Sequence, residues 1–83
     1  MSKMPKKIVL YTQPGCAPCN QVKAFLMQRG VDFEVRDVAA DARALAELAE
    51  LGYLATPVTV VDGEAVVGFN RKRLGALLQG SAG

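Results

Sequence analysis

Histidine and tryptophan are absent from this chain of 83 residues, and cysteine occurs only twice. Without histidine the commonest general base is missing, so neither a Ser–His nor a Cys–His catalytic triad can be built. Two cysteines are also too few for a secreted mini-protein that is held together by disulfides. With no histidine beside them, they cannot supply the four nitrogen or sulfur ligands of a structural zinc site within one chain.

Long apolar runs are missing as well. No stretch reaches the roughly 18 apolar residues of a membrane-spanning helix, and the run nearest the N-terminus, Ile8 to Leu10, is too short for the core of a signal peptide. We therefore expect a cytoplasmic protein with no membrane partner. The length predicts one domain over residues 1–83, and the content of 51% apolar and 22% charged residues is typical of a globular chain.

Acidic residues are missing from both ends of the chain. Residues 1–31 carry five cations and no acid, residues 32–64 carry eight acids and two cations, and residues 65–83 carry three cations and no acid. The net charge is nevertheless only +2, whereas nucleic-acid-binding domains usually carry a stronger basic excess. We therefore expect no nucleic-acid partner.

The first half of the chain predicts a strand, a helix and a second strand. Residues 8–12 form a short apolar run with β-branched and aromatic members, which indicates a buried strand. From about residue 17 to residue 29 the apolar side chains recur at helical spacing, and Gly30 is placed to end that helix. Residues 31–38 alternate, with Val31, Phe33 and Val35 on one face, so we expect a half-exposed strand.

The second half predicts a helix, a hairpin and a last helix. Residues 41–51 are rich in alanine, leucine and glutamate, Asp37 or Asp41 could cap them, and the stripe of Leu45, Leu48 and Leu51 is expected in the core. Residues 56–61 and 64–67 are expected to pair as antiparallel strands across Asp62-Gly63, a two-residue turn signal of type I′. Asn70 is placed to cap a short helix before a tail at residues 80–83.

The resulting order is β-α-β-α-β-β-α. A right-handed β-α-β crossover gives two adjacent parallel strands, and the hairpin adds an antiparallel pair. The economical arrangement is an α/β fold in which helices pack on one mixed four-stranded sheet.

The two cysteines, Cys16 and Cys19, are spaced as C-A-P-C at the start of the first helix. The positive end of a helix dipole and its free N–H groups favour a thiolate, which is the nucleophilic form of cysteine. Lys23, one turn further on, could add to this field. We assign the attacking role to Cys16, the more exposed position, and the resolving role to Cys19. Pro18 suits a first helical turn, where its missing N–H has no partner to lose.

Other interpretations of the pair remain open. The cysteines could be two small buried hydrophobic residues, in which case the domain would be a binding module without chemistry. They could also bind a metal or an iron–sulfur cluster between two chains, since each chain would then supply two of the four ligands.

Three features stand at defined places along the chain. They are the strand–CxxC–helix opening, Thr56-Pro57 about forty residues later, and a Gly68-Phe69 turn after the hairpin. Together they resemble the glutaredoxins of the thioredoxin fold. They are most similar to the small NrdH-type redoxins, which reduce ribonucleotide reductase. The resemblance extends from about Ile8 to Leu78.

The resemblance implies a monomeric dithiol–disulfide oxidoreductase that acts on protein disulfides. It implies no cofactor beyond the redox-active Cys16–Cys19 pair, no metal, and an external electron source, either thioredoxin reductase or glutathione. It also implies that the Thr56–Pro57 peptide bond is cis and lies beside the disulfide. The residues expected to contact substrate are Tyr11, Gln13, Pro18, Thr56, Pro57, Gly68, Phe69 and Asn70, the last three as the far wall of the groove.

The chain departs from the glutathione-using members at two places. They carry a lysine where this sequence has Gln13, and acids for the glutathione amine where it has Arg71, Lys72 and Arg73. An ammonium group would meet cations there instead of carboxylates. The chain also has Val66-Val67 where NrdH-type redoxins usually have Trp-Ser.

Overall fold

The computed structural model describes residues 7–79, so the predicted tail lies outside the described residues. The secondary structure comprises β1 (Ile8–Thr12), α1 (Ala17–Gln28), β2 (Glu34–Asp37), α2 (Ala42–Glu50), β3 (Val58–Val61), β4 (Glu64–Val67) and α3 (Arg71–Gln79). The strands form one sheet in the order β2-β1-β3-β4. The β1–β2 pair is parallel and the other two pairs are antiparallel. The predicted β-α-β-α-β-β-α order and mixed sheet are confirmed.

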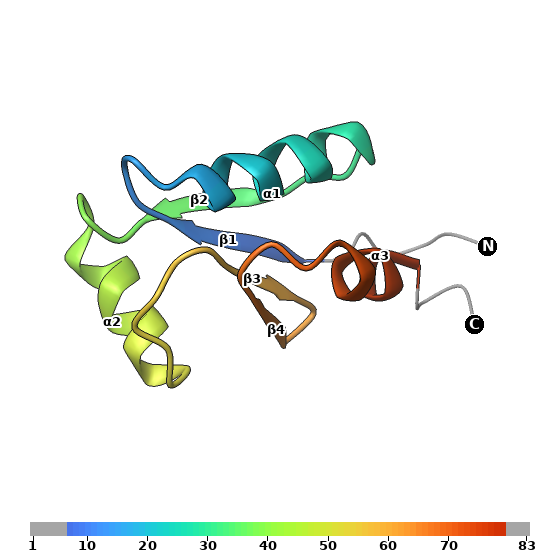
Figure 1. Cartoon of the computed structure of the whole chain (residues 1–83). Helices are drawn as coiled ribbons and strands as arrows, with labels where there is room; N and C mark the ends of the chain where they lie inside the picture. Colours follow the sequence, from blue (N-terminus) through green and yellow to red (C-terminus); the bar gives the residue numbers. More distant parts are fainter. Residues whose placement is uncertain (1–6, 80–83) are drawn as a thin grey trace.

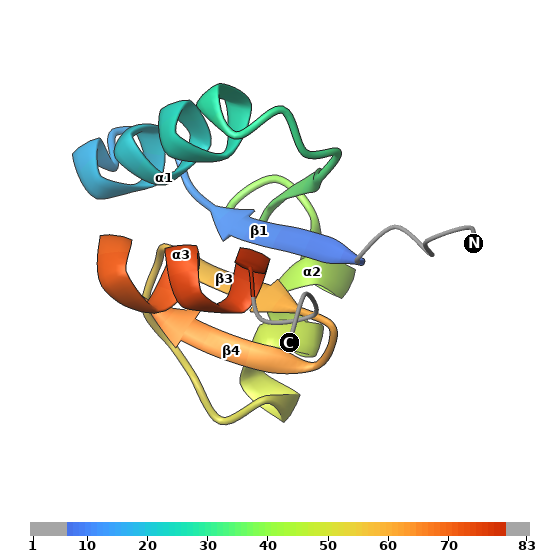
Figure 2. The ribbon, with the colours of Figure 1, turned by 90° about the vertical axis from the view of Figure 1, so that its right-hand side faces the viewer.

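The sheet is covered by helices on both faces (Figures 1 and 2). Successive side chains of a strand point to opposite faces, so Leu10 is buried in the cluster with α1 and α3, while Tyr11 is buried in the cluster with α2. The first cluster contains Ile8, Leu10, Val22, Phe25, Leu26, Val61, Val66 and Leu74. Burying a side chain such as Leu26 stabilises the fold by about 1.5–3 kcal/mol. This cluster therefore fixes α1, and with it the cysteine pair at its N-terminus, against the sheet.

The β3–β4 hairpin turns at Asp62 and Gly63, as predicted. Their φ angles are 50° and 88°, and a type I′ turn requires positive φ at both central residues. The backbone N–H of Lys7 donates to Oδ1 of Asp62 over 2.9 Å. The start of β1 is thereby joined to the tip of the hairpin.

The predicted alternation over residues 31–38 is wrong in part, because β2 begins only at Glu34. Val31 and Phe33 pack on the first cluster from the segment that leads into the strand. Val35 is 43% exposed. It lies on β2, an edge strand of the sheet, where cover from neighbouring elements is incomplete.

The predicted leucine stripe of α2 is also only partly in the core. Leu48 is buried together with Ala44, whereas Leu45 and Leu51 are 46% and 44% exposed. Leu45 is displaced by about 100° around the helix from Ala44, and Leu51 is the C-cap residue beyond the last turn. At the other end of α2, Asp41 is the N-cap and accepts from the N–H groups of Arg43 and Ala44.

Candidate functional site

The two cysteines form a disulfide at the N-terminus of α1, with their Cα atoms 5.2 Å apart. Cys16 is the N-cap residue, in an extended conformation that ends the loop after β1. It is half-buried, whereas Cys19 is only 1% exposed. The sulfur of Cys16 is therefore the one that a partner can approach.

The helix terminus supplies one backbone hydrogen-bond donor to the sulfur of Cys16 and another to its carbonyl. The backbone N–H of Cys19 donates to Sγ of Cys16 over 3.2 Å, and the N–H of Asn20 donates to the Cys16 carbonyl over 3.3 Å. The first turn holds no acidic residue that would oppose the positive end of the helix dipole. Pro18 is exposed in this turn, and its position agrees with the preference of proline for the start of a helix.

Thr56 and Pro57 lie beside the disulfide, and the peptide bond between them is cis, as the resemblance implied. The hydroxyl of Thr56 donates to Sγ of Cys16 over 3.8 Å. The ring of Pro57 is fully buried. Within residues 7–79, no hydrogen bond occupies the backbone N–H or C=O of Thr56. A polar main-chain edge is therefore available next to the more exposed sulfur.

The turn after β4 is joined directly to this loop. The backbone N–H of Gly68 donates to the carbonyl of Pro57 over 2.8 Å, and Gly68 has φ of 76°, which favours glycine. The next residue, Phe69, packs edge-to-face on Phe25 of α1, with centroids 6.2 Å apart. The side chain of Asn70 accepts from the N–H of Arg73, so it caps α3 as predicted.

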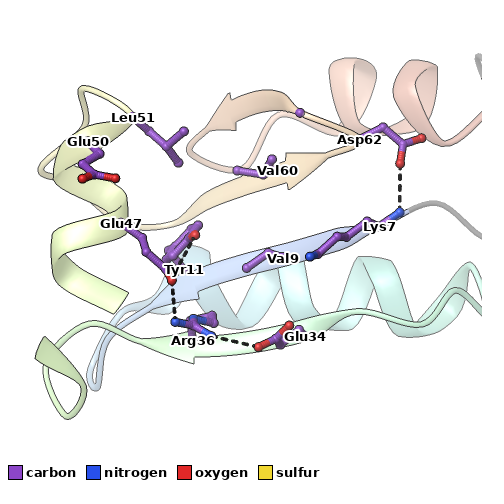
Figure 3. Close-up of a pocket in the computed structure, with 11 residues that line it drawn as sticks. Lys7, Val9, Tyr11, Glu34, Arg36, Glu47, Glu50, Leu51, Val60 and Asp62 are labelled. Atoms are coloured by element: carbon purple, nitrogen blue, oxygen red, sulfur yellow. Dashed lines mark hydrogen bonds and ion pairs between the residues drawn. The ribbon is translucent and has the colours of Figure 1, made fainter. Parts of the chain in front are cut away.

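Tyr11 lies elsewhere, in the core cluster between the sheet and α2. Its hydroxyl donates to Oε1 of Glu47 over 3.1 Å (Figure 3). Burial raises the pKa of Tyr11, and the bond to Glu47 raises this pKa further. The structure thus brings Pro18, Thr56 and Pro57 to the disulfide and joins Gly68 to Pro57. Phe69 packs instead on Phe25, Asn70 caps α3, and Tyr11 lies against α2.

Gln13 is exposed in the loop between β1 and α1. Among the described residues its side chain makes no hydrogen bond. A role for Gln13 in substrate binding therefore stays a prediction.

One hollow lies on the α2 side of the sheet, as the close-up of Figure 3 shows. It has a volume of about 630 Å³ and an apolar floor that includes Val9 and Val60. Arg36 lines it and is bound by two carboxylates, those of Glu34 at 3.0 Å and Glu47 at 2.9 Å. Its lining includes neither cysteine, so this hollow is separate from the disulfide.

A smaller groove of about 310 Å³ lies between α1 and the start of α3. Sequence reasoning identified Phe69 as a substrate contact and Arg71 as a cation where glutathione-using members carry acids, but it missed the other lining residues, which are Gln21, Ala24, Phe25 and Gln28. A signal was present, since residues 21, 24, 25 and 28 follow helical spacing and begin about one turn after the CxxC pair. From the sequence, the apolar spacing over residues 17–29 predicts only the helix itself.

Metal and membrane features are absent from the described part of the chain. Residues 7–79 contain no group of three or more cysteine, aspartate or glutamate side chains gathered as metal ligands. They also contain no helix that is long and apolar enough to cross a membrane.

The Glutaredoxin family model matches residues 8–66. This chain belongs to the glutaredoxin family. It is 34% identical over 80 residues to the Gene 56 protein of Mycobacterium phage D29, covering 94% of this chain and 89% of the relative. The resemblance inferred from the three sequence features is thereby confirmed.

Solved structures of thioredoxin-like and glutaredoxin-like proteins share the fold. The thioredoxin-like protein BC3987 is 45% identical, with a TM-score of 0.84 over 87% of this chain and 100% of the other. The glutaredoxin-like NrdH-redoxin from Escherichia coli is 28% identical, with a TM-score of 0.78 over 86% and 93%. The thioredoxin-like fold is confirmed, and the family together with the Cys16–Cys19 pair supports a thiol redox function.

Proposed function

We propose that this glutaredoxin-family protein reduces disulfides of other proteins by dithiol–disulfide exchange. The observation that carries the proposal is the asymmetry of the cysteine pair. Cys16 is half-buried at a helix N-terminus, and Cys19 is buried behind it. The sulfur of Cys16 can therefore contact a substrate, while the sulfur of Cys19, in the same turn of helix, remains shielded until it resolves the mixed disulfide.

The exchange begins with the reduced pair. The Cys16 thiolate attacks one sulfur of the substrate disulfide; a new S–S bond forms, the substrate S–S bond breaks, and the departing sulfur takes up a proton. Cys19 then loses its proton and attacks Sγ of Cys16. The Cys16–Cys19 disulfide forms, and the second substrate sulfur leaves and is protonated. Two electrons and two protons pass to the substrate in total.

The backbone beside Cys16 supports a protein substrate. Thr56 leaves its main-chain N–H and C=O unpaired, and an extended segment can add to such an edge as a strand does. The hydroxyl of Thr56 already reaches Sγ of Cys16. A substrate segment bound to Thr56 would be positioned with its disulfide at this sulfur.

We further propose that a thioredoxin reductase, not glutathione, returns electrons to the pair. The NrdH-redoxin from Escherichia coli is described by its thioredoxin-like activity profile, and ribonucleotide reductase is the protein substrate that the NrdH-type resemblance suggests. In this chain Arg71 and Lys72 are exposed at the start of α3. Both would repel the ammonium group of glutathione.

The test offers the oxidised protein two electron sources in parallel. One reaction contains NADPH and thioredoxin reductase, the other NADPH, glutathione and glutathione reductase, and both are followed by reduction of insulin disulfides. We expect insulin reduction in the first reaction and little in the second. Failure of the chemically reduced protein to reduce insulin would overturn the proposed activity. Faster reduction with glutathione would overturn only the proposed electron source.

A further inference from the structure

The floor of the groove between α1 and α3 is aromatic. Phe25 and Phe69 meet at an interplanar angle of 73°, and both line the groove. Phe25 is 8% exposed, and Phe69 is half-buried. An edge-to-face pair of this kind can accept a further apolar or aromatic side chain.

The walls of the groove carry unused polar groups. Gln21 and Gln28 are exposed on α1, with the small side chain of Ala24 between them. Neither amide has a hydrogen-bond partner within residues 7–79. A side-chain amide can both donate to and accept from a peptide main chain, so this wall can bind an extended segment.

The charge around the groove is positive. Arg71 lines it, and the guanidinium of Arg29 lies 4.8 Å from the centroid of the Phe25 ring. None of the ion pairs among the described residues includes either of them, whereas Arg73 pairs with Glu64. Two cations beside the groove are therefore available to carboxylates of a partner.

The lining of the groove includes neither cysteine, but the groove begins about one helical turn from Cys16. Along α1, Gln21 lies about 7.5 Å and Gln28 about 18 Å beyond Cys16, at 1.5 Å per residue. On the other side, Phe69 follows Gly68, which is hydrogen-bonded to Pro57. An extended chain rises about 3.3 Å per residue, so the groove is within reach of residues about two to six positions from a cysteine held at Cys16.

We propose that this groove binds an acidic segment of the protein substrate that carries an aromatic or large apolar side chain close to the target cysteine. The apolar side chain packs on Phe25 and Phe69, the main chain bonds to Gln21 and Gln28, and the carboxylates meet Arg71 and Arg29. The proposal rests on the proposed function and specifies the substrate of the same site.

The kinetic test mixes the chemically reduced protein with disulfide peptides in single-turnover stopped-flow experiments. The peptides differ only in a three-residue segment placed three to five positions from the cysteine on either side, which is Asp-Phe-Glu, Lys-Phe-Lys or Asp-Gly-Glu, and glycine fills the positions between this segment and the cysteine. We expect the first to react about tenfold faster than the second, a difference of about 1.4 kcal/mol. The glycine peptide should fall between them. Hydroxyethyl disulfide, which has no flanking residues, serves as the reference for the thiol chemistry itself.

Two variants with the same change in net charge separate the groove from general attraction. Arg71→Glu should abolish the preference for the acidic peptide, because Arg71 lines the groove. Lys72→Glu is the matched control and should keep most of the preference, since Lys72 is exposed but is not part of the lining. Equal rates for all flanks with the unaltered protein, or equal losses in both variants, would overturn the groove proposal while leaving disulfide reduction intact.

A binding test does not depend on the chemistry at all. An Asp-Phe-Glu peptide with serine in place of cysteine is titrated into the isotope-labelled protein. We expect the side-chain amide signals of Gln21 and Gln28 to shift. No shift at millimolar peptide would overturn the proposal, even if hydroxyethyl disulfide is reduced. A lack of reaction with every disulfide would instead overturn the proposed function.

Discussion

The backbone N–H of Cys19 points at the sulfur of Cys16, 3.2 Å away. After reduction the same N–H can donate to a thiolate, and hydrogen bonding to a charged form favours that form. We therefore expect the alkylation rate of Cys16 in the reduced protein to reach half of its maximum well below pH ~8.5, the pKa of a free thiol. The rate of iodoacetamide labelling against pH measures this. A single midpoint at or above that value would contradict the prediction.

The different exposure of the two cysteines predicts different fates for their variants. Cys19→Ser should accumulate a mixed disulfide with an oxidised protein substrate, because Cys16 attacks but nothing resolves the product. Cys16→Ser should accumulate none, since the remaining cysteine, Cys19, is only 1% exposed in the native structure. Mass spectrometry of the mixtures under non-reducing conditions shows which adduct forms. The opposite pattern would reverse the assigned roles.

The cations at the start of α3 predict a gain of function with glutathione. Arg71→Asp combined with Lys72→Asp should raise the kcat/KM of glutathione-coupled reduction severalfold, because two repelled charges become attractive to the glutathione amine. Arg43→Asp with Lys7→Asp makes the same change in net charge at exposed positions outside the groove and is the control. An unchanged or lower value in the first double variant would remove charge as the reason for poor use of glutathione.

The raised pKa of Tyr11 predicts that the folded protein loses stability at high pH. Its pKa lies above the ordinary 10.0, first because of burial and then because of Glu47. Above pH 10 the unfolded tyrosine ionises before the folded one, so folding becomes less favourable as the pH rises through the folded pKa. In Tyr53→Phe, which leaves Tyr11 as the one tyrosine, the tyrosinate absorbance should have its midpoint above pH 10. Adding Glu47→Gln should lower that midpoint, and a first midpoint at or below about 10 would contradict the assignment.

The N-cap of α2 predicts a measurable contribution to stability. Oδ1 of Asp41 accepts from the N–H groups of Arg43 and Ala44. Replacing such a cap with alanine usually lowers the free energy of unfolding by about 0.5–2 kcal/mol. Asp41→Ala should therefore shift the urea midpoint downward, whereas Asp32→Ala, at an exposed acid outside the helices, should shift it little. Equal shifts in the two variants would show that charge, not capping, is responsible.

Sequence reasoning predicted those elements in which local chemistry and tertiary packing agree. The positive φ angles of Asp62 and Gly63 and the cap at Asn70 are properties of a few adjacent residues. The burial of β1 could also be predicted from its apolar run, because an interior strand of this sheet is covered on both faces. The position of the cysteine pair follows from the order of the elements, since a loop after β1 must lead into α1.

The predictions that failed concern residues whose burial or orientation depends on elements distant in the sequence. Leu45 and Val35 have the polarity expected of buried residues, but Leu45 lies off the face of α2 that holds Ala44 and Leu48, and Val35 lies on an edge strand. Tyr11 alternates correctly along β1, yet only the placement of Glu47 on α2 shows that its hydroxyl points away from the disulfide. The groove at Gln21 and Gln28 was missed because it forms only when the 68–71 segment packs against α1.

The two-residue turn at Asp62-Gly63 has an effect at the opposite end of the hairpin. It fixes the pairing of Val61 with Glu64 and hence of Val58 with Val67. That pairing brings Gly68 to the carbonyl of Pro57 and Phe69 to Phe25. One residue inserted into the turn would offset β4 against β3, and a slip of one residue exchanges the faces of a strand. The length of a loop remote from the sulfur atoms is thus part of what defines the shape of the substrate groove.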